Sequence, residues 1–352
     1  MKILADYTYD QLIDLMQSLG YPKFRGEQVY KAIIQSKDYY DLTNVPKDMR
    51  ASLSQDYILK PVKIKEVVKS NIDGTKKYLI SLHDGHVVES VFLKQNYGNT
   101  ICLSTQVGCR MGCKFCASTL DGLVRNLSNG EMLSIIALIN ADNGKPTDRN
   151  FTNIVLMGSG EPLDNFDNVV AFLRAVNDPH GFNIAMRNIS VSTCGLVEKI
   201  NDLAKLNLDI TLCISLHAPN DEIRRTIMPI ANKYTIAQIV TALKNYIKTT
   251  GRRAVLEYTL IEGVNDSDSA VRELANTFKN MLVHFNVICI NPYDSKFVRP
   301  AQKKAYAFVD KLNKAGLSAT LRASHGTDIQ SACGQLRNQR KKEGQQVWKI
   351  VK

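Results

Sequence analysis

Cys109-Arg-Met-Gly-Cys113-Lys-Phe-Cys116 places three cysteines within eight residues, separated by three residues and then by two. Thiolates at this spacing can bind one face of a [4Fe–4S] cluster, which takes four ligands when its coordination is complete. No fourth cysteine or histidine follows at a short interval. The stretch therefore predicts a cluster held by Cys109, Cys113 and Cys116, with one iron left open to a group that is not protein.

The residues around these cysteines fit a cluster loop, and a zinc knuckle or ordinary buried cysteines stay open as alternatives. Gly108 and Gly112 allow the backbone to bend tightly, and Phe115 could shield a cluster from water. A zinc knuckle would need a fourth ligand close by, but the nearest histidines in sequence are His86 and His180. Ordinary buried cysteines rarely lie this close together.

The composition is that of a globular protein with a real core. Hydrophobic residues make up 44% of the 352 residues, and no run approaches the roughly 18 apolar residues that a membrane span needs. The first eight residues lack the apolar segment of a secretory signal. Eight cysteines are too few for a disulfide scaffold in a chain of this length, so we expect a cytoplasmic protein that uses clustered cysteines for metal binding or catalysis.

The charge favours a polyanionic partner. The formal net charge is +11, and residues 337–352 hold six Lys or Arg against one Glu. Such an excess raises the affinity for nucleic acid without identifying a target. A basic tail can contact RNA phosphates, but it can also be a solvated segment that only aids solubility.

Two small regions precede the main fold. Residues 1–60 show helical spacing of apolar residues, and a basic turn at Lys23–Arg25 either contacts a phosphate backbone or is simply solvated. Residues 61–97 alternate apolar and polar side chains, with turn signals at 71–74 and 83–85, and predict a β-meander extension. The meander places Glu89 inside an apolar run, where it is either a solvated strand-edge residue or a carboxylate held in a cleft with a task.

Residues 98–322 alternate strands and helices, which predicts a parallel sheet with helical crossovers. The expected strands are Thr100–Ser104, Asn153–Met157, Ile189–Ser192, Ile210–Leu216, Ala254–Ile261, Val283–Ile290 and Leu317–Arg322. The expected helices cover residues 130–141, 166–177, 196–206, 235–249, 267–281 and 300–315. About six repeats predict an α/β fold built as an incomplete (β/α)6 barrel, with ligands bound beyond the carboxyl ends of its strands.

Several unusual residues follow these strands directly. The three-cysteine loop follows the first, and the later strand ends carry Gly158–Pro162, Ser192–Gly195, Ser215–His217 and Asn291–Tyr293. Residues 323–352 form a separate C-terminal segment that carries one cysteine, Cys333. Other strand cysteines, Cys102, Cys194, Cys213 and Cys289, are typical of core residues, and His217 and His325 are either catalytic or structural.

Together these residues resemble the radical S-adenosylmethionine (SAM) superfamily and, within it, the RlmN/Cfr family of RNA adenosine methyltransferases. The family's three-cysteine motif matches the opening stretch, and its Gly-Glu-Pro motif matches Gly158–Pro162. Two further cysteines that distinguish this family match Cys102 and Cys333, the latter in Ala-Cys-Gly-Gln-Leu. The resemblance extends to about residue 336 and implies a radical SAM partial barrel. Pro162 favours the RlmN branch, which methylates C2, over the antibiotic-resistance branch, which methylates C8.

The resemblance implies one [4Fe–4S] cluster with three cysteine ligands, whose open iron is chelated by SAM. One electron cleaves SAM to a 5′-deoxyadenosyl radical, so the cofactor carries the difficult chemistry. Cys333 matches the methyl acceptor, which becomes S-methylcysteine at the expense of one SAM, and a second SAM supplies the radical. Glu89 matches the proton acceptor. Cys102 matches the residue that forms a transient disulfide with Cys333 and releases 2-methyladenosine, so that two SAM are used for each methylation.

The match also carries over SAM contacts and partners. The cofactor-binding positions are Gly160, Glu161, Ser192, Ser215, Leu216, His217 and Asn291. The implied substrates are 23S rRNA at the peptidyl-transferase centre and adenosine 37 of tRNAs. An electron donor such as flavodoxin or ferredoxin is implied, and the chemistry needs no more than a monomer. The alternatives are a C8 methyltransferase of the Cfr type and a non-catalytic Fe–S protein that binds RNA and senses redox state.

Overall fold

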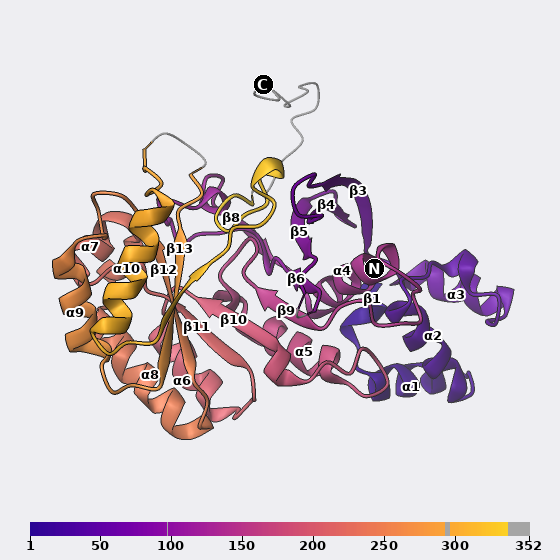
Figure 1. Cartoon of the computed structure of the whole chain (residues 1–352). Coiled ribbons are helices and arrows are strands. Elements are labelled where there is room, and N and C mark those ends of the chain that lie inside the picture. The colour runs from indigo at the N-terminus through magenta and orange to yellow at the C-terminus, as the bar shows by residue number, and fades with distance from the viewer. Residues whose placement is uncertain (97, 293–295, 337–352) are drawn as a thin grey trace.

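One ten-stranded sheet is the frame of the protein (Figure 1). The computed structural model describes residues 1–96, 98–292 and 296–336, so Tyr293 and the predicted basic tail lie outside the described residues. The parallel part of the sheet consists of Thr100–Cys102 (β6), Asn153–Leu156 (β9), Ile189–Thr193 (β10), Thr211–Ser215 (β11), Ala254–Leu260 (β12), Val283–Cys289 (β13) and Ala319–Arg322 (β14). These strands confirm the apolar runs of residues 98–322, with ends that differ by a few residues.

The helices of this part cover the outer side of the curved sheet (Figure 1). They are Asn129–Asp142 (α4), Phe166–Asn177 (α5), Val197–Lys205 (α6), Asp221–Ile227 (α7), Ile236–Thr250 (α8), Asp268–Phe278 (α9) and Gln302–Lys314 (α10). Six of them confirm the expected crossovers, whereas the seven-residue α7 was too short to be predicted from periodicity. Because the strand order runs from β14 to the meander without closing, the prediction of an incomplete α/β barrel is confirmed.

The β-meander continues the same sheet. Its strands are Val62–Lys69 (β3), Lys76–Leu82 (β4) and Val87–Leu93 (β5), and each pairs antiparallel with the next. Strand β5 then pairs antiparallel with β6, with Val91 opposite Cys102. The extension is therefore hydrogen-bonded into the barrel sheet.

The N-terminal region packs three helices beside the meander: Tyr9–Ser18 (α1), Phe24–Ile34 (α2) and Lys47–Asp56 (α3). Two short parallel strands, Lys2–Ile3 (β1) and Tyr57–Ile58 (β2), close this region on itself. The Thr8 and Gln11 side chains form a reciprocal capping box that begins α1. An Asp6 carboxylate oxygen accepts a hydrogen bond from the Gly130 N–H at 2.6 Å, which joins this region to the first turn of α4.

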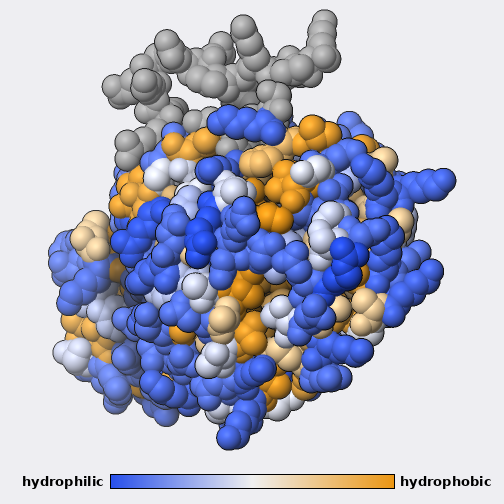
Figure 2. All heavy atoms as spheres, turned by 90° about the vertical axis from the view of Figure 1, so that its left-hand side faces the viewer, coloured by the Kyte–Doolittle hydropathy of each residue, from blue (hydrophilic) through white to orange (hydrophobic). Residues whose placement is uncertain are grey.

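Helix α4 is the centre of the core. Its residues from Asn129 to Asn140 are buried, and it contacts α2, α5, β3 and β4. The run Met132–Ile139 is apolar except for Ser134, and a helix that is apolar on most sides is stable only when it is enclosed in this way. The outer face that carries α7 and α9 is mostly hydrophilic, and its apolar residues lie in small separate groups (Figure 2). In the part of the chain that the structure describes, no helix is both long and apolar enough to cross a membrane.

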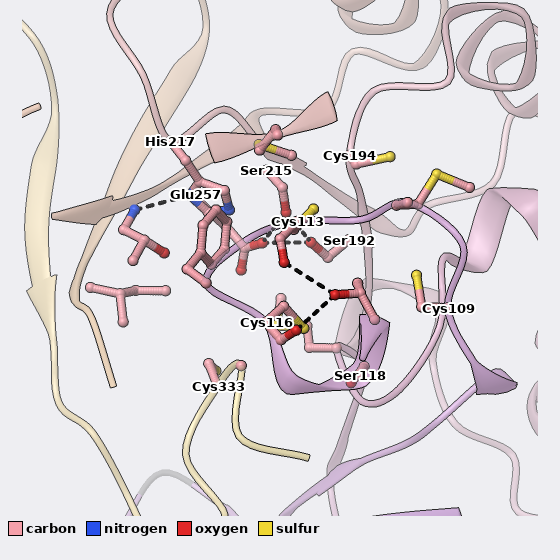
Figure 3. Close-up of a pocket in the computed structure, with 18 of the residues that line it drawn as sticks. Cys109, Cys113, Cys116, Ser118, Ser192, Cys194, Ser215, His217, Glu257 and Cys333 are labelled. Carbon is pink, nitrogen blue, oxygen red and sulfur yellow. Dashed lines mark hydrogen bonds between the residues drawn. The ribbon is translucent and has the colours of Figure 1, made fainter. Parts of the chain in front are cut away.

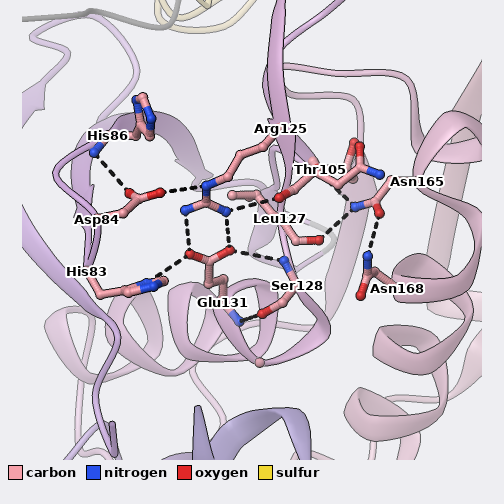
Figure 4. Close-up of polar contacts among 12 residues, drawn as sticks. His83, Asp84, His86, Thr105, Arg125, Leu127, Ser128, Glu131, Asn165 and Asn168 are labelled. Carbon is pink, nitrogen blue, oxygen red and sulfur yellow. Dashed lines mark hydrogen bonds and ion pairs between the residues drawn. The ribbon is translucent and has the colours of Figure 1, made fainter. Parts of the chain in front are cut away.

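A further two-stranded sheet flanks the cysteine loop and was not predicted. Its strands, Gln106–Gly108 (β7) and Leu123–Asn126 (β8), are only three and four residues long and pair antiparallel. Arg125 on β8 forms ion pairs with Glu131 of α4 at 2.8 Å and with Asp84 of the β4–β5 turn at 2.6 Å (Figure 4). His83 lies 3.3 Å from the same Glu131 carboxylate. This network joins the meander, the cysteine loop and the central helix.

Glu131→Gln should lower the free energy of unfolding by about 2 kcal/mol, because Arg125 loses its buried counter-charge and retains the partly exposed Asp84. The Glu131 side chain is 1% exposed, so water cannot replace it without disturbing the core. Urea denaturation followed by circular dichroism measures the change. Asp202→Asn, which removes an exposed ion-pair partner on α6, is the control and should have almost no effect. Equal losses in the two variants would contradict the importance given to the buried network.

Candidate active site

The predicted strand-end loops meet around one cavity at the carboxyl ends of the parallel strands (Figure 3). Predicted site residues that line it are Cys109, Cys113, Cys116, Gly160, Glu161, Ser192, Ser215, His217, Asn291 and Cys333. Parallel strands present their carboxyl ends at one edge, which is why residues far apart in sequence converge there.

The cysteine loop is bent by its glycines, as predicted. Gly108 has φ +77°, and a Cβ at this position would lie 1.9 Å from the Gly122 carbonyl oxygen. The Thr119 hydroxyl donates to the carbonyl oxygens of Cys113 at 3.2 Å and Cys116 at 2.9 Å. These contacts hold the backbone of the loop while its cysteine side chains line the cavity.

The donor set fits an iron–sulfur cluster better than a single metal ion. Among the described residues, no three His, Cys, Asp or Glu side chains gather closely enough to hold one ion. A cluster needs no such convergence, because each thiolate binds a different iron. Of the histidines that a zinc knuckle would require, His86 lies in the β4–β5 turn and His180 stacks on Tyr9, and neither lines the cavity. Burial raises the pKa of the Cys109 thiol to about 12, so cluster binding would have to displace its proton.

Glu161 is a buried carboxylate presented by the turn after β9. One of its oxygens accepts from the Cys194 N–H at 2.7 Å and the other from the Leu163 N–H at 3.0 Å. Burial raises the pKa of this carboxyl, although the backbone hydrogen bonds oppose the rise. Gly160 has φ +110°, and a Cβ there would lie 2.7 Å from Gln106 Cβ, so the turn requires glycine at this position. A cation or ammonium group in the cavity would find this carboxylate fixed in place.

Glu257 on β12 is a site residue that the sequence did not reveal. Its Oε2 accepts hydrogen bonds from the hydroxyls of Ser192 at 2.5 Å and Ser215 at 3.2 Å (Figure 3). Its Oε1 lies 4.0 Å from the Arg322 guanidinium. The only hint of its role in the sequence was that a charged residue stands within the apolar run Ala254–Ile261. Glu257 fixes both serine hydroxyls in the cavity wall.

The segment after β11 presents only part of its length to the cavity. His217 has φ +58°, and its Nδ1 accepts from the Thr259 N–H at 2.9 Å, so the ring is the neutral tautomer with its proton on Nε2. Its ring packs edge-on against Phe115, with ring centroids 5.0 Å apart. The Leu216 side chain is fully buried in the main core, and Leu216 is not among the residues that line the cavity, unlike Ser215 and His217 on either side of it.

The chain just after β13 is held by Arg299, a residue that the sequence analysis did not identify. The Asn291 side-chain oxygen accepts a hydrogen bond from Arg299 at 2.6 Å. The same guanidinium donates to the Ile290 carbonyl oxygen at 3.0 Å. Asn291 is thus held at the point where the cavity meets a neighbouring pocket, which it also lines.

That neighbouring pocket contains Cys102, and Cys333 lines both spaces. Both thiols are free. Burial raises the pKa of Cys102 to about 12, and proximity to Cys333 adds to the rise, whereas Arg322 opposes it. The loop around Cys333 is tied to the cysteine loop, because the Ala117 N–H donates to the Gly334 carbonyl oxygen at 2.8 Å.

Glu89 is buried, so the interpretation of it as a solvated strand-edge residue is wrong. Strand β5 lies inside the sheet, between β4 and β6. The Glu89 carboxylate forms an ion pair with Lys77 at 3.6 Å, and both side chains are at most 7% exposed. Since alternate strand residues share a face, Glu89 lies on the face that carries Val91 and Leu93, which line the pocket of Cys102.

The remaining cysteines divide into two groups. Cys213 is buried within β11, as the core interpretation predicted. Cys194 and Cys289 are buried too, but they also line the cavity, which an apolar strand pattern could not reveal. His325 does not line the cavity, but it lines the pocket of Cys102, and its Nδ1 lies 3.2 Å from Asp73.

Comparison with known proteins gives consistent matches. Residues 103–275 match the model of the radical SAM superfamily. A probable dual-specificity RNA methyltransferase RlmN of Lachnospira eligens is 46% identical over 344 residues, which cover 96% of each chain. A Clostridioides difficile protein of the same description is 45% identical over 341 residues, covering 96% of this chain and 98% of the relative. The crystal structure of a radical SAM methyltransferase from Sphaerobacter thermophilus is 38% identical, with a TM-score of 0.90 over 96% of this chain and 99% of that one.

His217→Asn should make the stability less dependent on pH. Burial and the Arg224 guanidinium lower the pKa of His217 to about 3. The unfolded chain therefore takes up a proton near pH 6.5 that the folded chain does not, and stability falls as the pH drops below that value. Asparagine can accept the same hydrogen bond and tolerates positive φ.

The substitution should remove about 1 kcal/mol of the stability loss between pH 6.5 and 5.5. Urea unfolding of both proteins at the two pH values measures it. An unchanged pH dependence in the variant would show that His217 is not the residue responsible.

Proposed function

Because the chain belongs to the RlmN-type RNA methyltransferases of the radical SAM superfamily, we propose that it methylates C2 of adenosine in 23S rRNA and in tRNA. The observation that carries the proposal is the position of Cys333, which borders both the cavity of the three clustered cysteines and the pocket of Cys102. A methyl carrier must reach SAM on one side and a resolving thiol on the other. The place of Cys333 at the border of the two spaces supports this role.

Cys109, Cys113 and Cys116 would hold the [4Fe–4S] cluster, and the other cavity residues would hold SAM. When bound, the cluster supplies the electron that cleaves SAM and starts radical chemistry. Methylation at C2 of adenine requires a radical route, because this electron-poor carbon does not attack a methyl electrophile. Each Glu161 oxygen accepts one backbone hydrogen bond and retains capacity for the SAM ammonium group. Ser192, the Ser215–His217 segment and Asn291 would contact the ribose, methionine and adenine parts.

Cys333 would first act as a nucleophile. Its thiolate attacks the methyl carbon of one SAM, so that an S–CH3 bond forms as the carbon–sulfonium bond breaks and S-adenosylhomocysteine leaves. A second SAM is used to activate this methyl group toward C2. The buried Glu89 carboxylate, held by Lys77, would accept the C2 proton.

Cys102 would complete the reaction. Its thiolate attacks the Cys333 sulfur, so that a disulfide forms while the bond between sulfur and the transferred carbon breaks. The carbon leaves with the electron pair and takes up a proton to become the methyl group. A thiol reductant must then return two electrons to the disulfide.

The cluster would need its own electron donor. A small electron carrier such as flavodoxin or ferredoxin would reduce it in the cytoplasm. One copy of the chain suffices for the whole reaction.

The helical region 1–60 would contribute RNA contacts. Its basic turn exposes Lys23 and Phe24, and the Arg25 guanidinium lies 4.7 Å from the Phe24 ring centroid. An exposed aromatic ring beside cations is a surface on which single-stranded bases can stack.

The product identifies the reaction. Cluster-reconstituted protein, incubated with SAM, a reductant and a 23S rRNA fragment or tRNA, should yield 2-methyladenosine in nucleoside mass spectrometry, and Cys333→Ala should yield none. If 8-methyladenosine alone appears, the chain is a C8 enzyme. If wild-type protein modifies neither RNA, the proposed function is wrong.

Cys102→Ala should trap a covalent protein–RNA adduct, because the methylene bridge to Cys333 then has no resolving thiol. A denaturing gel with labelled RNA detects it. Cys213→Ala, which removes a buried cysteine outside both pockets, is the matched control and should turn over without an adduct. If the protein is instead a non-catalytic Fe–S protein, the wild type, Cys102→Ala and Cys213→Ala should bind RNA equally well, and none should form an adduct.

A further inference from the structure

The turn between β3 and β4 holds the base of the loop that carries Cys333. One oxygen of Asp73 accepts from the Gly326 N–H at 2.9 Å and lies 3.2 Å from His325 Nδ1. Its other oxygen accepts from the Thr75 N–H at 3.0 Å, which fixes the carboxylate within its own turn. Burial alone would raise the pKa of Asp73, but these hydrogen bonds outweigh it and lower the pKa, so the group is anionic.

The loop that carries Cys333 also places a carboxylate, Asp328, against the β3–β4 turn. Asp328 accepts from the Ser70 hydroxyl at 2.8 Å and from the Asn71 N–H at 3.0 Å. Each segment thus supplies a carboxylate to the other, although more than 250 residues separate them in sequence. Such reciprocal, charge-assisted hydrogen bonds fix both distance and orientation.

The base of the loop is also closed on itself. The Ser331 N–H and hydroxyl donate to the Gly326 carbonyl oxygen at 3.0 and 3.1 Å. A Cβ on Gly326, which has φ +58°, would lie 1.9 Å from the Ser331 oxygen, so only glycine fits this closure. Lys77 reaches the Gln330 carbonyl oxygen at 3.4 Å while it pairs with Glu89.

Cys333 follows this closed ring by two residues. Beyond it, the Gly334 carbonyl oxygen and the Leu336 carbonyl oxygen accept from Ala117 and Ser118 of the cysteine loop at 2.8 and 2.6 Å. The cysteine is therefore suspended between a base fixed by the meander and an end fixed by the cysteine loop. Loss of either attachment would let it leave the border of the two pockets.

We propose that Asp73 and Asp328 are positioning residues, which hold the ring of residues 326–331 so that Cys333 lies between the cavity and the pocket of Cys102. This proposal rests on the proposed role of Cys333 as the methyl carrier. Neither carboxylate touches the cavity. They act by keeping the Cys333 sulfur within reach of both reaction partners, and small displacements of a reacting group are costly.

The test measures how well Cys333 is presented to Cys102, independently of methylation. Full-length protein is equilibrated in glutathione buffers, where oxidised glutathione accepts two electrons and the two thiols become a disulfide with release of two reduced glutathiones. Mass spectrometry of the linked peptides then gives the effective concentration of the pair. Asp73→Ala should lower this value at least about tenfold, because it removes two charge-assisted contacts, and Asp328→Ala should do the same.

Asp84→Ala is the matched control. Asp84 occupies the next turn of the same meander and accepts from the His86 N–H at 3.1 Å, much as Asp73 accepts from Thr75, but it pairs with Arg125 and not with the Cys333 loop (Figure 4). This variant should lower thermal stability and leave the Cys102–Cys333 equilibrium within about twofold of wild type.

An unchanged equilibrium in Asp73→Ala and Asp328→Ala would overturn the proposal, as would an equal fall in Asp84→Ala. In methylation assays the first two variants should lower kcat and leave the KM for SAM unchanged. If wild-type protein makes no methyladenosine but the disulfide equilibrium responds as expected, the proposed function fails and the positioning role stands.

Discussion

The antiparallel pairing of β5 with β6 is the constraint on which the site depends. It joins the meander to the first strand of the barrel sheet and puts Val91 opposite Cys102. Because side chains alternate along a strand, this one register also turns Glu89 and Leu93 toward the same face. A shift of the register by one residue would turn Cys102 away from the pocket that it shares with Cys333.

The residues of the proposed reaction come from two parts of the sheet, one parallel and one antiparallel, which meet at the β5–β6 pair. The parallel strands bring loop residues to a shared edge, where a cavity suited to a small molecule forms. The antiparallel strands present side chains on a face, where Cys102 and the Lys77–Glu89 pair lie under the C-terminal loop. Cys333 lies where the edge meets the face. An open sheet permits this arrangement, since in a closed barrel the edge of β6 that pairs with β5 would be taken by another barrel strand.

Features that depend on the local pattern of residues could be predicted from the sequence. Apolar runs located the parallel strands, and their order placed the cluster cysteines, Glu161 and Ser192 at one edge. The sequence alone could not reveal that Glu89 is buried, because its burial depends on which strands lie on either side of β5 in the sheet. The contacts of Glu257 were hidden for the same reason, since its serine partners come from other strands. His325 and Asp73 meet only after the whole sheet has formed, and periodicity says nothing about such pairs. Cysteine spacing predicted a cluster, whereas the roles of Cys102 and Cys333 came from resemblance.

The open barrel also exposes two sheet edges to solution, at β3 and β14 in the described part of the chain. Such edges invite pairing with another copy and hence aggregation. Strand β3 carries Lys63, Lys65 and Lys69, and a bulge near Glu66 interrupts its regular register. Strand β14 is only four residues long. Charge, irregularity and shortness protect the edges, so the molecule can keep its sheet open for catalysis without templating its own assembly into fibrils.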